Sequence, residues 1–333
     1  MNGMSLGYVL VRSIILVVLL MSAFAYFMVM ERKVIGYFQL RWGPVRVGPW
    51  GLLQPLADAL KMLAKEDALP LAADGLVFHV APALTLFVAL AAFAVIPLGP
   101  ALHLGGFILP LSIANPNTGL LFVLAVASLG VYGISLGGWA SQSKYALLGS
   151  LRASAQMVSY ELALGMAVIS AVVLSGSLSL PRMVAQQSLH TWAFIPDILG
   201  FIIFFICSVA ETNRAPFDLA EAEGELVAGF HTEYSGFRFA NFVMAEYINM
   251  FTLSALGVLL FLGGWNGPFG LGPSVWWLLA KMAVYLFLFI WIRVTFPRIR
   301  YDRLMQFGWK VLVPLGFLNL IWISVFVVGG GWR

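Results

Sequence analysis

Seven of the fifteen acidic residues of this chain lie within one stretch, from Glu211 to Glu246, of a sequence that is 61% hydrophobic. The stretch follows the apolar run DILGFIIFFICSVA and leads into a second one, INMFTLSALGVLLFLGG. A carboxylate at membrane depth costs about 2.5–3.5 kcal/mol on insertion scales, so acids placed between two membrane helices are expected to have a use. Carboxyl groups take up and release protons, and the pattern therefore indicates protons or cations moving in a protein-lined cavity.

The acids of this stretch have a spacing that suits proton exchange. If residues 218–227 are helical, Asp218, Glu221 and Glu225 share one face, whereas Glu223 points the other way. Like charges this close raise one another's pKa and can share protons near neutral pH. The spacing fits a solvated acidic face that docks on a basic partner equally well. Arg214, in the same stretch, either balances part of the charge or faces a substrate.

Two further ionisable residues lie inside predicted membrane spans. Glu161 lies in the fourth span, about one and a half turns from its start, and an acid at such depth is more often functional than structural. The alternative is an ion pair with an arginine that serves packing. Lys281 lies in the seventh span toward the outer side, where it either snorkels outward or acts as a cation on a proton path.

The elements that must position these residues are membrane helices. A mean hydropathy of +0.93 and a charged fraction of 10% place the chain among membrane proteins. Eight apolar runs of about 20 residues predict an all-α polytopic membrane protein with one domain, 1–333, that is a bundle of eight transmembrane helices. The predicted spans lie near residues 5–30, 76–97, 118–140, 156–175, 194–211, 241–263, 275–293 and 311–328. The first is not expected to be a cleaved signal peptide, because its apolar core is too long and Glu31, Arg32 and Lys33 follow it as a stop.

The positive charges predict the orientation of this bundle. Of the nineteen Lys and Arg residues, fifteen belong to the odd-numbered loops or to the helix ends beside them. Those loops are 31–75, 141–155, 212–240 and 294–310. The positive-inside rule places them in the cytoplasm and both termini outside. The net positive charge of the chain follows from this asymmetry between the loops, so we expect no nucleic-acid partner.

The first of these loops contains an amphipathic helix. Gln54, Asp58, Lys61 and Lys65 form one polar stripe, with leucines on the opposite side. A helix of this length and pattern lies in the membrane surface or docks on a partner. It is either a plain interfacial helix or a lip that admits a lipid-soluble substrate from the bilayer.

Residues that hold redox cofactors are scarce. Cys207 is the single cysteine, so the chain cannot close a disulfide within itself or hold an iron–sulfur cluster. The four histidines lack metal-ligand spacing, and no glycine-rich nucleotide fingerprint follows a strand-like run. We therefore expect no flavin, iron–sulfur cluster or metal on this chain, and any redox chemistry must come from a partner.

Four segments, taken together and in order, resemble the H subunit of bacterial NADH:quinone oxidoreductase, respiratory complex I. They are ERKVIGYFQLRWGPVRVGPWGLLQPLADALKMLAKED, GWASQSKYALLGSLRASAQMVSYE, ETNRAPFDLAEAEGELVAGFHTEYSGFRFA and RVTFPRIRYDRLMQFGWK. They lie between residues 31 and 310, nearly the whole chain. The resemblance implies a multi-pass subunit of the bacterial plasma membrane that joins the redox arm of the complex to small and antiporter-like membrane subunits.

The resemblance also implies roles for individual residues. In this family the subunit forms much of the chamber that the quinone substrate enters, and an acidic funnel links that chamber to proton pumping. The residues expected near the quinone are Glu31, Arg32, Asp58, Lys61 and Arg214. Those expected to form the funnel and couple protons are Glu161, Asp218, Glu221, Glu223 and Glu225. Further candidates for the proton path are Glu211, Glu233, Glu246 and Lys281.

Three other interpretations remain open at the level of the sequence. The related membrane subunit of energy-converting hydrogenases shares the acidic loop but lacks the full GPVRVGPWGLLQPLAD run, and it would have no quinone. A stand-alone secondary transporter with midplane carboxylates is a second, although the charge pattern has no inverted repeat. A structural anchor for the redox arm, with the acids as a docking surface, is the third.

Overall fold

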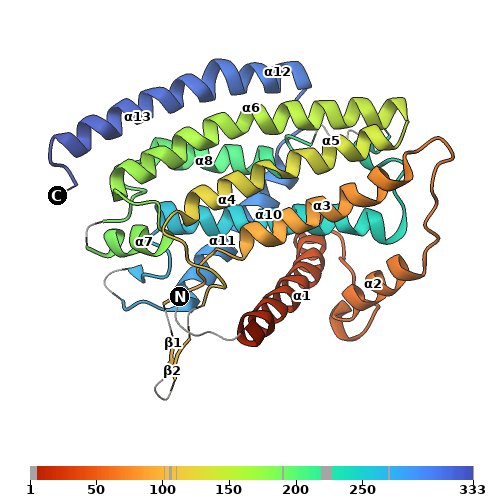
Figure 1. Ribbon diagram of the computed structural model, residues 1–333, viewed down its shortest axis with the longest axis horizontal. Helices are drawn as coiled ribbons and strands as arrows, with labels where there is room; N and C mark the ends of the chain where they lie inside the picture. The colour runs from red at the N-terminus through yellow and green to blue at the C-terminus, as the bar shows by residue number, and fades with distance from the viewer. Residues whose placement is uncertain are drawn as a thin grey trace.

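The computed structural model describes residues 6–100, 102–104, 107–109, 111–189, 191–218, 227–268 and 271–332. Long helices make up most of this part of the chain (Figure 1). The α-helices are α1 (Leu6–Phe38), α2 (Gln54–Ala64), α3 (Gly75–Phe93), α4 (Gly119–Ser128), α5 (Gly130–Ala140), α6 (Lys144–Ser175), α7 (Leu180–Leu189), α8 (Ile198–Glu211), α10 (Gly236–Phe261), α11 (Val275–Thr295), α12 (Tyr301–Phe307) and α13 (Val313–Val328). Shorter elements are the 3-10 turns η1 (Pro49–Gly51) and η2 (Gly229–His231), the π-helical turn η4 (Gly308–Leu312), and the strands β1 (Leu102–Leu104) and β2 (Phe107–Leu109).

Seven helical segments of the described chain are long and apolar enough to cross a membrane, which confirms a polytopic membrane protein. Two of them are composite: α4 and α5 form one segment interrupted at Leu129, and α12, η4 and α13 form another. The fifth predicted span corresponds to α8, which has 14 residues. At 1.5 Å per residue it is about 21 Å long, short of the roughly 30 Å of a bilayer's hydrocarbon core. The count of eight spans therefore stays a prediction.

Several helices extend well beyond the apolar runs that predicted them. The helix α1 continues through Glu31, Arg32 and Lys33 to Phe38, eight residues beyond the predicted end of the first span at residue 30. Likewise, α6 begins at Lys144 instead of residue 156, so Glu161 lies near the middle of a long helix and not close to its start. Glu, Arg and Lys are good helix formers, so a charge marks the edge of the apolar layer without breaking the helix.

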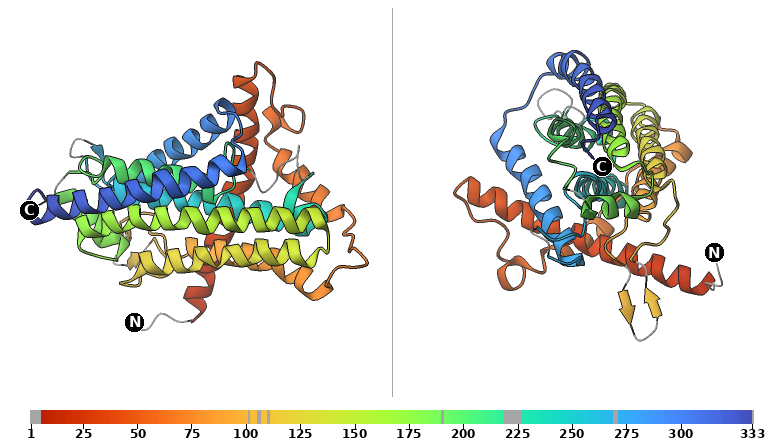
Figure 2. Two further views of the ribbon diagram at one scale, coloured as in Figure 1. Left: turned by 90° about the horizontal axis from the view of Figure 1, so that it is seen from above. Right: turned by 90° about the vertical axis from the view of Figure 1, so that its left-hand side faces the viewer.

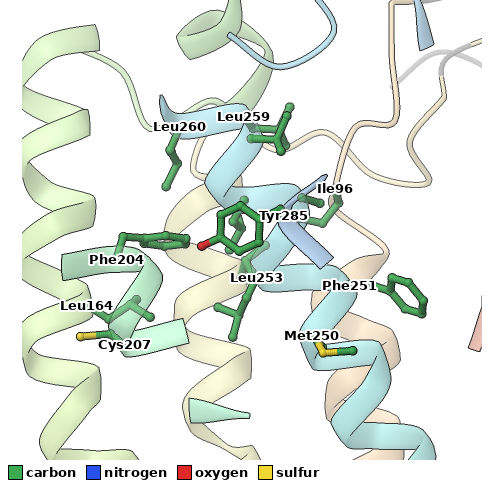
Figure 3. Packing of buried hydrophobic residues seen from close by; sticks show 14 of the residues in the cluster. Ile96, Leu164, Phe204, Cys207, Met250, Phe251, Leu253, Leu259, Leu260 and Tyr285 are labelled. Carbon is green, nitrogen blue, oxygen red and sulfur yellow. The ribbon is translucent and has the colours of Figure 1, made fainter. Parts of the chain in front are cut away.

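The centre of the bundle is α10, which packs against α3, α8 and α11. Its second half, 250–261, is buried throughout. Figure 3 shows the surrounding core, where Phe204 of α8 and Tyr285 of α11 lie against it. At Gly257 a Cβ atom would lie 2.8 Å from the Tyr285 ring, so only glycine permits this close approach of the helices.

The peripheral helices expose apolar side chains. In the most apolar 18-residue stretch of α1 only 17% is buried inside the bundle, against 78% in the corresponding stretch of α10. Figure 2 shows α1 crossing the other helices at a steep angle. In a membrane protein such an apolar surface faces lipid. The amphipathic helix predicted in the first loop is present as α2, whose residues Leu56, Leu60 and Leu63 are all exposed, and its place in the membrane surface stays a prediction.

The connection between α3 and α4 departs from the all-α prediction. It contains a two-stranded antiparallel hairpin, in which Leu102 of β1 pairs with Leu109 of β2 (Figure 1). The sequence predicted helices only. The prediction holds for the membrane-spanning part of the described chain, and the exception lies in a connection.

A buried acid that was not among the predicted site residues ties three helices together. Asp197 is fully buried and caps the start of α8, where its carboxylate accepts a bond of 3.0 Å from the N–H of Gly200. It also accepts bonds from the Ser170 hydroxyl of α6 at 2.5 Å and from the Asn319 amide of α13 at 2.8 Å. Neutral donors thus satisfy this carboxylate.

Candidate functional site

Glu31 is the centre of a buried polar cluster drawn from four parts of the chain. Its side chain comes from α1 and is 5% exposed. Oε1 accepts hydrogen bonds from Nη1 of Arg214, at 3.2 Å, and from Nη1 of Arg293 in α11. Oε2 accepts a bond of 2.5 Å from the Tyr247 hydroxyl of α10. We call these four residues the Glu31 cluster.

The Arg214 guanidinium is held from two sides. It bonds Glu31 and lies 4.2 Å from the centroid of the Tyr247 ring, close enough for a cation–π interaction. It also interacts through its charge with Glu246, the neighbour of Tyr247 in α10. Phe24 packs its ring edge on Tyr247 at 5.2 Å. Glu31 and Arg214 are buried, whereas Arg293 is 39% exposed and Glu246 is half-buried, so the buried acid and the buried guanidinium balance each other.

The residues expected near the quinone separate into two groups. Glu31 and Arg214 meet in the buried cluster, whereas Arg32 and Asp58 form an ion pair of 2.9 Å at the surface. Gln54 donates to the same carboxylate at 2.9 Å, so this pair joins α1 to the polar stripe of α2. Lys61 is exposed on α2, one turn further along. Because Glu31 and Arg32 are adjacent, α1 directs one into the bundle and the other toward α2.

A second group of acids, both half-buried, lies between α6 and α8. Glu211, the last residue of α8, interacts through its charge with Glu161 of α6. The protonation of one carboxyl group therefore depends on that of the other. A cavity of about 10 Å³ adjoins Glu211, with Asn249 and Thr252 of α10 among its lining. This is close to the space that one water molecule needs, and the lining supplies it with polar partners.

The acidic loop is described only at its two ends. Glu221, Glu223 and Glu225 lie outside the described residues, so the helix expected over 218–227 is not tested. At the near end, the backbone carbonyl of Asp218 accepts a bond from the Arg298 guanidinium. At the far end, burial lowers the pKa of His231 to about 4, against a smaller raising effect from Asp218. His231 is therefore neutral near pH 7 and adds no positive charge to the loop.

The remaining candidates lie apart. Glu233 is half-buried in the turn before α10, and Glu246 lies beside Arg214. The Lys281 ammonium donates to the carbonyls of Leu262, Gly264 and Asn266 at 2.6, 3.0 and 2.6 Å. These carbonyls follow the C-terminal end of α10, where the helix dipole favours a cation. Lys281 thus caps α10, and its place on a proton path stays a prediction.

Sequence reasoning missed two members of the Glu31 cluster. Arg293 was counted only among the positive charges that orient the bundle, and Tyr247 was not considered. Arg293 lies in the last turn of the apolar helix α11, where a basic residue commonly sets the orientation of a span in the membrane. Its position in the sequence therefore gave no sign of a buried partner. Among the described residues, no group of three or more His, Cys, Asp or Glu side chains could hold a metal ion.

Comparisons with known proteins agree across nearly the whole chain. The profile of the family described as NADH dehydrogenase matches residues 11–324. The H subunit of the NADH-quinone oxidoreductase of Syntrophotalea carbinolica is 53% identical over 310 residues, which cover 93% of this chain and 92% of the relative. The H subunit numbered 2 of Geobacter metallireducens is 48% identical over 339 residues, 98% of each chain. The H subunit of Protochlamydia amoebophila is 50% identical over 307 residues, 92% of this chain and 94% of the relative.

Proposed function

The chain belongs to the NADH dehydrogenase family, and from that premise we propose that it is the membrane subunit of a proton-pumping NADH:quinone oxidoreductase. In this proposal it forms much of the quinone-binding chamber and couples quinone reduction to proton translocation. The electrons come from redox centres on partner subunits, and this chain carries no flavin, iron–sulfur cluster or metal. The names of its curated relatives favour this complex over an energy-converting hydrogenase.

The observation that carries the quinone part of the proposal is the Glu31 cluster. A quinone headgroup offers two carbonyl oxygens as hydrogen-bond acceptors and gains negative charge as electrons arrive. The guanidinium groups of Arg214 and Arg293 and the Tyr247 hydroxyl are donors of the kind that stabilise such charge. Glu31 balances their charge while no anion is present. The exposed leucines of α2, beside the Arg32–Asp58 pair, suit a lipid-side entry for the isoprenoid tail.

The proton part of the proposal rests on the acids that lead away from this cluster. Glu246 interacts with Arg214, and Glu211 interacts with Glu161. Together with Asp218, Glu221, Glu223, Glu225 and Glu233 they would form the acidic funnel toward the antiporter-like subunits. A change of charge at the quinone acts strongly over several ångströms in a low-dielectric interior, so it biases the protonation of these carboxyl groups.

The proposal includes a multi-pass position in the bacterial plasma membrane, with eight spans and both termini outside. The single cysteine, Cys207, is buried, so an introduced cysteine can be labelled selectively. Gly272→Cys and Gly330→Cys are expected to react with a membrane-impermeant maleimide from outside, since both lie beyond the predicted spans and a Cβ atom at either position meets nothing within 4 Å. Asp302→Cys, in the seventh loop, should react only from the cytoplasmic side. The opposite pattern would overturn the orientation.

A quinone entry beside α2 can be tested with a photoreactive quinone analogue. We expect it to label residues 34–65 in the assembled complex. Asp58→Ala removes the partner of Arg32 and should raise the KM for quinone by up to about fivefold, since a partly exposed ion pair contributes up to about 1 kcal/mol. Asp302→Ala, which breaks an exposed pair elsewhere, is the control. Labelling confined to other subunits, with an unchanged KM in Asp58→Ala, would contradict the proposed entry.

Copurification separates the proposed complex from its alternatives. Soluble iron–sulfur and flavin subunits together with antiporter-like membrane subunits are the expected partners. A nickel–iron subunit without a flavin subunit would identify a hydrogenase instead. If the redox arm copurifies but no acid-to-amide change affects proton movement, this chain is a structural anchor.

A further inference from the structure

Gln156 joins both ends of the turn that carries the site. Its side chain lies in α6, fully buried at the contact with α8. Its Nε2 donates to the backbone carbonyl of Ala210 at 2.8 Å and to that of Phe217 at 2.9 Å. These carbonyls belong to the residues directly before Glu211 and Asp218. A single amide therefore sets the positions of two acids that lie far apart from it in the sequence.

The turn 211–218 connects the two groups of ionisable residues. Glu211, at its start, interacts with Glu161, and Arg214, in its middle, bonds Glu31. Asn213 has a φ of 48°, in the left-handed region that few residues other than glycine adopt. Such a backbone persists only where the surroundings hold it in place. The Gln156 amide is one of the contacts that hold it.

The other half of the Gln156 amide gains no compensating contact among the described residues. Its Oε1 is buried and has no hydrogen-bond partner among the described residues. An unsatisfied buried acceptor costs about 1–3 kcal/mol. A methionine would fill nearly the same volume without that cost. The donated hydrogen bonds are therefore the contribution that distinguishes glutamine from an apolar residue here.

We propose that Gln156 is a positioning residue for coupling, whose amide fixes Glu211 and Asp218 relative to the Arg214–Glu31 ion pair. A change of charge in the Glu31 cluster then affects Glu211, because the turn between Arg214 and Glu211 is held in one geometry. This inference rests on the proposed function, and it adds a residue that touches neither the quinone nor a transferred proton.

Gln156→Met in the assembled complex removes the bonds that Nε2 donates to Ala210, Phe217 and, at 3.5 Å, Asn213, with little change of volume. We expect quinone reductase turnover to fall on the order of tenfold, because small displacements of reacting groups have large effects on rate. The KM for quinone should stay within about twofold, since Arg214 keeps its bond to Glu31 and its contact with the Tyr247 ring in the variant. Gln156→Glu retains one donor while its carboxyl group is protonated. Its turnover should therefore recover toward wild type as the pH is lowered from about 8 to about 6.

Gln187 provides a matched control. It is also buried, and its Nε2 donates to the carbonyls of Leu259 and Leu260 at 2.9 and 3.1 Å. Gln187→Met should lower thermal stability at least as much as Gln156→Met and leave turnover per assembled complex unchanged. Equal losses of turnover in both methionine variants, or wild-type turnover in Gln156→Met, would refute the inference. If Gln156→Met fails to assemble, a pH-independent wild-type turnover in Gln156→Glu refutes it. Wild-type complex without quinone reductase activity would instead overturn the proposed function, and this inference with it.

Discussion

Replacing Glu31 by glutamine is expected to destabilise the subunit more than the loss of any surface acid. The change keeps the shape of the side chain but removes the charge that two guanidinium groups share. Arg214 is then left buried without its main counter-ion. Removing one partner of a buried ion pair costs about 3–5 kcal/mol. We expect a strongly reduced yield of assembled complex on native gels and a lower midpoint of thermal unfolding.

An exposed ion pair gives the matched control for this experiment. Asp302 lies 3.3 Å from Arg300, and their side chains are 68% and 79% exposed. Surface pairs contribute about 0–1 kcal/mol, so Asp302→Asn should assemble normally and unfold at nearly the wild-type temperature. Equal behaviour of Glu31→Gln and Asp302→Asn would show that the Glu31 cluster contributes little to stability.

Glu161→Gln, and separately Glu211→Gln, are expected to impair quinone reductase activity and proton pumping together. Each variant removes one of two carboxyl groups that interact through charge, and each nearly preserves shape. Groups that exchange protons typically contribute a hundredfold or more to a rate, so we expect a loss of at least about tenfold. The double variant Glu221→Gln with Glu225→Gln should behave in the same way if the loop acids belong to the funnel. Proton-uptake assays on membrane vesicles, together with quinone reduction per assembled complex, measure both effects.

Asp197→Asn is the control for these acid-to-amide changes. Asp197 is also a buried acid, but its partners are Ser170, Gly200 and Asn319 at the opposite end of α8. Asparagine retains the ability to cap the helix. Activity and pumping per assembled complex should therefore stay near wild type. Fully assembled Glu161→Gln and Glu211→Gln complexes with unimpaired pumping would refute the acidic funnel.

The sequence predicted which segments are helical, because an apolar run of membrane length has few other structures available to it. It predicted the helix ends less well. Residues such as Lys33 and Lys144 were taken as loop residues from their charge, whereas they continue helices beyond the apolar layer. The helix α8 differs in the opposite sense. It begins at Ile198, so the first residues of the predicted span 194–211 are not helical.

The candidate site was predicted in part. The resemblance placed Glu31 and Arg214 in one functional set, and the structure brings them together over a separation of 183 residues. Tyr247 and Arg293 lie 216 and 262 residues from Glu31, and no local pattern could connect them to it. Such contacts depend on how α1 crosses α10 and α11, which hydropathy does not specify. The resemblance also placed Arg32 and Asp58 near the quinone, but their ion pair, which joins the consecutive helices α1 and α2, was not predicted.

The separation of the residues in the Glu31 cluster also sets the order in which the site can form during synthesis. A chain is made from its N-terminus, so α1 enters the membrane long before the ribosome reaches Arg293. During that interval Glu31 lacks at least one of its two guanidinium partners, and α1 buries only a small part of its apolar surface against the bundle. The first helix made is therefore among the last to be fixed. A nascent chain that stops before α11 would contain every acid of the proposed funnel and still lack Arg293, the second guanidinium partner of Glu31.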